Sequence, residues 1–171
     1  VNKKEINLFY KNLFIFLEKV SKIFNKKIII SLHPDKIKYF KKEYSQIKNS
    51  TKISISKKRT IDLINGSKFV IFAYSSAVLH AVILKKGVLG IRSRYFGEHF
   101  LNQHEKYVKE FNFPSFSIDD EITPISKSHI LFKFDRSLKT YNNYIKKKLI
   151  YKEGLPSSYK IVQIIKRIYF N

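Results

Sequence analysis

The sequence contains no cysteine, which excludes disulfide bonds, a thiol nucleophile and the common cysteine-ligated zinc sites. No apolar run is long enough and free enough of charge to cross a membrane. Charged residues within the first ten positions do not fit a signal peptide. We therefore expect a cytoplasmic protein. The length of 171 residues suits a sizeable core, and we expect a single domain over residues 1–171.

Several catalytic signatures are also absent. The chain lacks the Gly-x-Gly-x-x-Gly pattern of dinucleotide sites, the Walker-type phosphate loop, the Gly-x-Ser-x-Gly elbow of hydrolases and the HExxH zinc motif. His99 and His104 lie near Glu98 and Glu105, a pattern more typical of a solvated helix face than of a metal site. The acidic segment 119–121 is interpreted as a solvated loop, with Mg²⁺ binding as the alternative. We expect no metal ion.

Acidic residues are few, since 13 Asp and Glu stand against 34 Lys and Arg and leave a net charge of +21. An excess of this size occurs in proteins that bind nucleic acid or anionic membranes. Most of these cations are lysines accompanied by many Ile, Asn, Phe and Tyr residues, a composition that A/T-rich codons produce without selection for a ligand. The lysines are scattered as short pairs and triplets. We therefore expect no nucleic-acid binding.

The most informative stretch runs from residue 67 to residue 91. Its pattern predicts a buried strand at residues 69–73, a helix at 77–84 and a second buried strand at 88–91. Ser75 is expected to cap this helix, and Gly87 is expected to end it. Together these elements form a βαβ unit.

The flanking segments alternate in the same way. We expect strands at residues 28–32, 51–56 and 115–118, and helices at 2–24, 35–44, 60–65, 98–110 and 157–170. Thr60 is expected to cap its helix and Gly66 to close it. Residues 130–134 fit a strand or a helix start, and Asp135 or Ser137 is expected to cap a helix ending near residue 150. The predicted fold class is α/β: a Rossmann-like parallel sheet flanked by helices in three layers, with C-terminal helices.

Two polar turns are expected at the same edge of this sheet. His33 and Pro34 follow the first strand, and Ser75 and Ser76 follow the third. Parallel strands end at a common edge, where ligands of open α/β sheets bind. An imidazole and two hydroxyls that converge there can bind a phosphate group. The alternative is that His33 is a surface or capping histidine and that Ser75 only caps the helix.

Four short motifs occur in a set order: a strand followed by His33-Pro34, then Thr60-x-x-Leu63-Ile64, then Ser75-Ser76-Ala77-x-x-x-Ala81, then Lys86-Gly87-Val88. This order resembles the carboxyl-terminal domain of GT-B glycosyltransferases. The resemblance covers residues 27–92 best. It is closest to bacterial enzymes of surface and capsular polysaccharide synthesis, namely sialyltransferases and polysialyltransferases, Kdo transferases and CDP-glycerol glycerophosphotransferases.

The resemblance implies a nucleotide-sugar donor, CMP- or CDP-activated, with no separate cofactor, and a glycan or lipid-linked acceptor. His33 would be the catalytic residue that contacts the donor phosphate. The donor site would be lined by His33, Pro34, Tyr74, Ser75, Ser76 and Ala77. His80 departs from the pattern, because many GT-B enzymes have a glutamate there that holds the ribose.

The general base of these families lies in an amino-terminal domain that this sequence lacks. The resemblance therefore implies that the chain is the carboxyl-terminal half of a two-domain enzyme, inactive alone and cytoplasmic or peripheral at the inner membrane. Two alternatives remain open: a nucleotide-sugar 2-epimerase of the same fold, and a basic α/β module that binds RNA or an anionic membrane.

Overall fold

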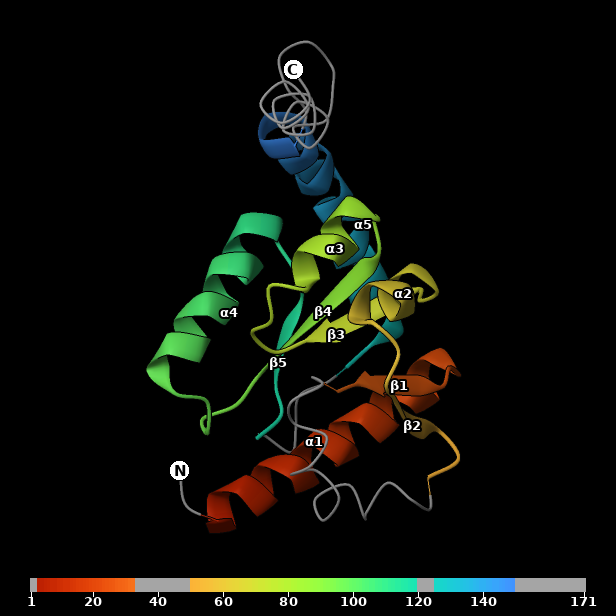
Figure 1. Cartoon of the computed structure of the whole chain (residues 1–171), viewed down its shortest axis with the longest axis vertical. Helices are drawn as coiled ribbons and strands as arrows, with labels where there is room; N and C mark the ends of the chain where they lie inside the picture. The colour runs from red at the N-terminus through yellow and green to blue at the C-terminus, as the bar shows by residue number, and fades with distance from the viewer. Residues whose placement is uncertain (1–2, 33–49, 120–124, 150–171) are drawn as a thin grey trace, which may run out of the picture.

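The computed structural model describes residues 3–32, 50–119 and 125–149. In chain order the elements are α1 (Lys3–Phe24), β1 (Ile28–Ser31), β2 (Ile53–Ser56), α2 (Thr60–Asn65), β3 (Phe69–Phe72), α3 (Val78–Ile83), β4 (Gly87–Arg92), α4 (Glu98–Phe111), β5 (Ser115–Ser117), α5 (Lys127–Tyr144) and the π-helix η3 (Ile145–Leu149) (Figure 1). The helices predicted at residues 35–44 and 157–170 lie outside the described residues.

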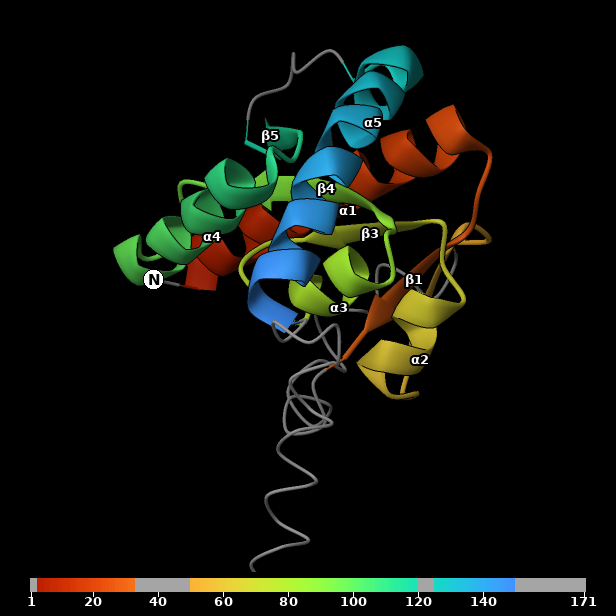
Figure 2. The ribbon, with the colours of Figure 1, turned by 90° about the horizontal axis from the view of Figure 1, so that it is seen from above.

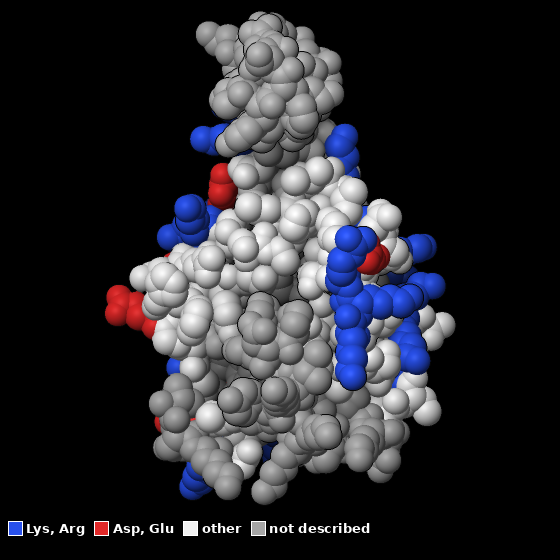
Figure 3. Space-filling model, in the orientation of Figure 1, with Lys and Arg blue, Asp and Glu red and all other residues white. Residues whose placement is uncertain are grey.

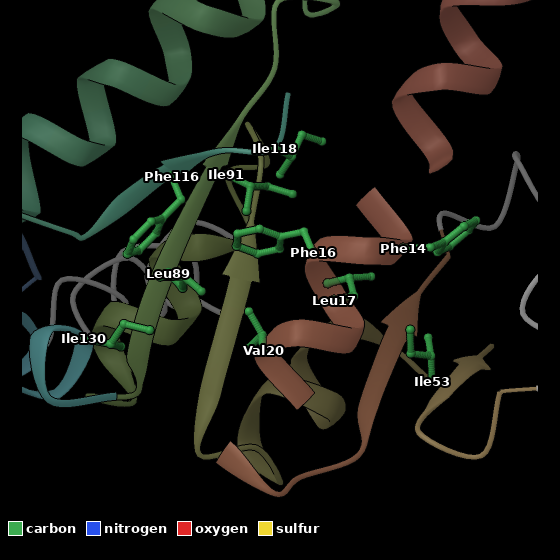
Figure 4. Packing of buried hydrophobic residues seen from close by; sticks show 10 residues of the cluster. All are labelled: Phe14, Phe16, Leu17, Val20, Ile53, Leu89, Ile91, Phe116, Ile118 and Ile130. Carbon is green, nitrogen blue, oxygen red and sulfur yellow. The ribbon is translucent and has the colours of Figure 1, made fainter. Parts of the chain in front are cut away.

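The strands pair in parallel and form two sheets, where the sequence predicted one. β1 pairs with β2, and β4 lies between β3 and β5. In the larger sheet Phe72 is opposite Gly90, and Arg92 is opposite Ser117. Figures 1 and 4 show the β1–β2 pair beside β3. The predicted α/β fold with parallel strands and C-terminal helices is confirmed.

Helices cover both faces of the larger sheet, because β4 is apolar on both sides. Leu89 and Ile91 point toward α1, whereas Val88 and Gly90 point toward α3 and α4. A parallel strand that is buried on both faces needs a helical layer on each side. Figure 2 shows the strands between α1 and the first half of α5 on one side and α2 and α3 on the other. The three predicted layers are therefore present.

Helix α1 holds the two sheets together. Its apolar stripe repeats every three or four residues, as the sequence predicted. Phe16, Leu17 and Val20 of this stripe are buried in one cluster with Ile53 of β2 and Leu89 of β4 (Figure 4). Burial of each such side chain stabilises the fold by about 1.5–3 kcal/mol. The described strands of the two sheets are not hydrogen-bonded to each other, so packing against α1 joins them.

Helix α5 begins earlier than predicted. It starts at Lys127, and the hydroxyl of Ser126 accepts a hydrogen bond from a backbone amide of the first turn at 3.1 Å. The helix alternative for residues 130–134 is confirmed, but Asp135 and Ser137 are not caps. Ser137 is buried inside the helix, where its hydroxyl donates to a backbone carbonyl one turn earlier.

Two predicted N-caps also differ from the structure. Thr60 is the first residue of α2, and its hydroxyl lies 2.8 Å from that of Ser31. The hydroxyl of Ser75 accepts a hydrogen bond from the amide of Ala77, but α3 begins only at Val78. The Ser75 hydroxyl therefore stabilises the turn that leads into α3, whereas the Thr60 hydroxyl joins the start of α2 to the end of β1. The predicted closing residue of α2, Gly66, is confirmed.

Gly87 is the first residue of β4 and does not cap α3. The turn after α3 has Lys85 in the left-handed region, with φ of 51°. Gly87 is needed for a different reason, because a Cβ atom there would lie 2.3 Å from the ring of Phe69 on the neighbouring strand. The absence of a side chain lets this ring lie across the beginning of β4.

We predict that Gly87→Ala destabilises the protein by about 1–3 kcal/mol, because the new methyl group overpacks the core against Phe69. Gly66→Ala is the matched control, since its φ of −78° suits alanine and the nearest atom to the new Cβ is 3.7 Å away. The control should be neutral or stabilising by up to about 1 kcal/mol. Urea denaturation measures both. Equal stability of the two variants would contradict the predicted contact.

Candidate functional site

The carboxyl ends of β3, β4 and β5 lie at one edge of the larger sheet. The segments that follow them are residues 73–77, 93–97 and 118–119. β1 and β2 also pair in parallel, so residue 32 and residues 57–59 follow at one edge of the smaller sheet. Open α/β sheets bind their ligands at this edge.

Ser75 and Ser76 are exposed in the segment that follows β3. Their backbone carbonyls accept hydrogen bonds from Val78 and Leu79 at 3.2 and 3.0 Å, which fixes the turn. The Ser75 hydroxyl also accepts from the Ala77 amide at 3.2 Å. Within the described part of the chain, no partner is found for the Ser76 hydroxyl. The two side chains can therefore donate to a ligand from an ordered turn.

Tyr74 joins this turn to the segment after β4. Its ring stacks on Phe100 at a centroid distance of 4.3 Å and meets Phe96 edge-on at 5.4 Å. These contacts account for its partial burial and keep residues 73–77 beside residues 93–97. Ala77 is half-buried against the core. Ligand contacts of Tyr74 and Ala77 stay predictions.

His33 and Pro34 lie outside the described residues. The strand that leads to them, β1, ends at Ser31, whose hydroxyl is hydrogen-bonded to that of Thr60. The convergence of His33 with Ser75 and Ser76 therefore stays a prediction. His80 is exposed on α3.

The structural role of His104 was not predicted from the sequence. This residue is buried, with only 1% of its surface exposed. Its Nδ1 is hydrogen-bonded to the backbone carbonyl of Ala73, and its Nε2 lies 2.8 Å from the Ser115 hydroxyl. A carbonyl oxygen can only accept, so Nδ1 carries the proton in the neutral ring and Nε2 accepts from Ser115. The imidazole thus links α4 to the ends of β3 and the beginning of β5.

The surroundings of His104 favour this neutral form. Burial lowers the pKa of His104, with a further lowering from Arg92, although the bond to Ala73 and the charge of Glu105 act in the opposite direction. Its ring stacks on Phe72 at 5.1 Å. The predicted solvated face of α4 is therefore wrong for His104. The sequence did contain a signal, because His104 precedes Tyr107 and Phe111 on one helical stripe.

Asp119 is also structural, and its interpretation as a solvated residue is wrong. Only 4% of its side chain is exposed. Its carboxylate accepts hydrogen bonds from the Ser93 hydroxyl at 2.9 Å and the Arg94 amide at 2.5 Å, and Nε of Arg94 lies 3.6 Å away. The carboxylate therefore fixes the segment after β4. Residues 120 and 121 lie outside the described part of the chain, and no metal-binding group of three or more His, Asp or Glu is found within it.

A group of exposed basic side chains lies at α2. Lys57, Lys58 and Arg59 are exposed in the segment between β2 and α2, and Figure 3 shows Lys and Arg atoms grouped over α2. Arg59 is paired with Asp62 through two hydrogen bonds of 2.9 and 3.0 Å. The two lysines therefore leave this region positively charged.

Comparison of the chain with protein-family models, curated proteins and solved structures finds no match. Among the described helices, none has the length and apolarity needed to span a bilayer.

We predict that stability decreases as pH falls below about 6.5, because His104 has a lower pKa in the folded than in the unfolded protein and the unfolded chain then binds more protons. The slope is at most about 1.4 kcal/mol per pH unit for one proton. His104→Gln should remove this contribution, whereas His99→Gln, an exposed change on the same helix, should retain it. Urea denaturation at pH 5 to 8 measures both. An unchanged pH dependence in His104→Gln would contradict the assignment.

Proposed function

We propose that this chain is the donor-binding domain of a glycosyltransferase of bacterial cell-surface polysaccharide synthesis. The observation that carries the proposal is the exposed Ser75–Ser76 turn at the carboxyl end of β3, in a parallel α/β fold. His33 follows β1 in the sequence, as Ser75 and Ser76 follow β3. The resemblance in motif order to GT-B enzymes supports the same site.

The proposed chemistry is stabilisation of a leaving phosphate. When the bond between the sugar and the phosphate breaks, negative charge builds on the phosphate oxygens. Hydroxyl donors of Ser75 and Ser76 and the imidazole of His33 lower the barrier if they are fixed where this charge develops. Tyr74 and His104 contribute indirectly, because they position the turn that carries the serines.

The proposed donor is a CMP- or CDP-activated sugar. A CMP leaving group is a single phosphate that one imidazole and two hydroxyls can bind without a metal-bridged diphosphate. The proposed acceptor is a glycan or a lipid-linked glycan, presented from a second domain of the full enzyme or from the inner membrane. The basic side chains over α2 favour such an anionic membrane surface as the place of action.

The basic group over α2 also favours a second candidate function, an α/β module that binds RNA. In this function Lys57 and Lys58 would contact the phosphates of a nucleic acid backbone. The two functions differ in ligand size, because a mononucleotide is sufficient for the first. They also differ in salt dependence, since several phosphate contacts give a steep loss of affinity with salt.

We predict that the chain binds CMP or CDP more tightly than UDP, and that Mg²⁺ is not required. Ser76→Ala and His33→Ala should each weaken binding by about 1.5–3 kcal/mol, because each loses a hydrogen bond to a charged phosphate. Ser128→Ala and His129→Ala are matched controls on α5 and should bind as the wild type does. Isothermal titration calorimetry provides the measurement.

Preference for UDP, or dependence on Mg²⁺, would contradict the CMP-type donor and favour a UDP-sugar transferase or epimerase. Absence of binding to all three nucleotides, with salt-sensitive binding to single-stranded RNA, would contradict the transferase and favour the RNA-binding module.

A further inference from the structure

The arginines of this chain are distributed differently from its lysines. The five arginines are at positions 59, 92, 94, 136 and 167. Three of them lie at or within three residues of the carboxyl ends of strands: Arg59 three residues after β2 of the smaller sheet, Arg92 as the last residue of β4, and Arg94 two residues later. Arginine presents a planar fork of donors that matches a phosphate group, which lysine does not. Codon bias that enriches lysine does not account for this placement.

Arg59 and Arg94 have carboxylate partners. Arg59 is paired with Asp62, and Arg94 lies beside the buried carboxylate of Asp119. Arg92 differs from both, because no ion pair or hydrogen bond of its guanidinium occurs among the described residues, and its side chain is exposed. It is the only exposed residue of β4.

The strand register places Arg92 at the edge where β3 passes into the segment that carries Ser75 and Ser76. Phe72, the last residue of β3, is opposite Gly90 of β4, and Arg92 lies two residues beyond Gly90, as Tyr74 lies two residues beyond Phe72. Neighbouring strands lie about 4.8 Å apart.

Arg92 also lies on the same side of the sheet as that turn. Val88 and Gly90 point toward α3 and α4, so the alternation of side chains along β4 directs Arg92 to that side. The electrostatic effect of Arg92 on His104 of α4 agrees with this direction. Ser75 and Ser76 lead into α3, which covers the same side.

We propose that Arg92 binds an anion together with the hydroxyls of Ser75 and Ser76, and that this anion is the phosphate of the donor nucleotide. The guanidinium supplies two parallel N–H donors and a fixed positive charge, and the serines supply O–H donors. β4 is buried from Gly87 to Ile91, which holds the arginine backbone in place. Identification of the anion as a nucleotide phosphate rests on the proposed function, whereas the anion site itself does not.

The test compares Arg92→Gln and Arg92→Lys with Arg136→Gln, which removes the same charge from an exposed position on α5. Isothermal titration calorimetry with CMP and with inorganic pyrophosphate measures the affinities at fixed ionic strength. Arg92→Gln should weaken both ligands by about tenfold to a hundredfold, the effect of losing hydrogen bonds to a charged group. Arg92→Lys should lie between Arg92→Gln and the wild type, and Arg136→Gln should bind as the wild type does.

Wild-type affinity for CMP in Arg92→Gln would overturn this inference and leave the donor-binding function standing. Binding of pyrophosphate but not CMP, lost in Arg92→Gln alone, would support the anion site and contradict the nucleotide function. Equal losses in Arg92→Gln and Arg136→Gln would show a general charge effect and overturn the site. Absence of binding to either ligand by the wild type would overturn both proposals.

Discussion

Burial of β4 on both faces is the constraint on which the rest of the structure depends. Gly87 to Ile91 are all buried, so one helical layer must cover each face of the sheet. Connections that run through covering helices make the neighbouring strands parallel. Parallel strands in turn place the segments after β3, β4 and β5 at one edge. Arg92 is the point at which β4 leaves the core and becomes accessible to a ligand.

The elements with strong local patterns could be predicted from the sequence. The apolar stripe of α1, with Phe16 and Val20, and the strand–helix–strand unit from Phe69 onward depend on short-range periodicity that the sequence shows directly. The features that were missed depend on tertiary contacts. The sequence indicates a helix cap at Gly87. It does not show that the ring of Phe69, on the neighbouring strand, excludes a side chain at this position. The structural role of Asp119 likewise requires Ser93 and Arg94, which are distant in sequence.

The candidate site shows the same division. The sequence predicted that Ser75 and Ser76 follow a strand, and they do follow β3, although only Phe72 of that strand is fully buried. His104 could not be identified as the residue that holds Ala73, because its two partners lie just after β3 and in β5, far from it in sequence. The significance of Arg92 depends on strand register, which places it at the edge where β3 passes into the segment with Ser75 and Ser76. The fold thus places Arg92 and Arg94 at the carboxyl edge of the larger sheet, a position that depends on how the strands pair.

The central claim is that a phosphate-bearing nucleotide binds at the carboxyl edge of the β3–β4–β5 sheet. Titration of the ¹⁵N-labelled chain with CMP, followed by amide chemical shifts, tests this claim most directly because it locates the ligand without a substitution. We expect the largest changes at Ser75, Ser76 and Arg92, with small changes at Lys68 and Lys86, which lie at the opposite edge. Changes concentrated at Lys68 and Lys86 would contradict the account.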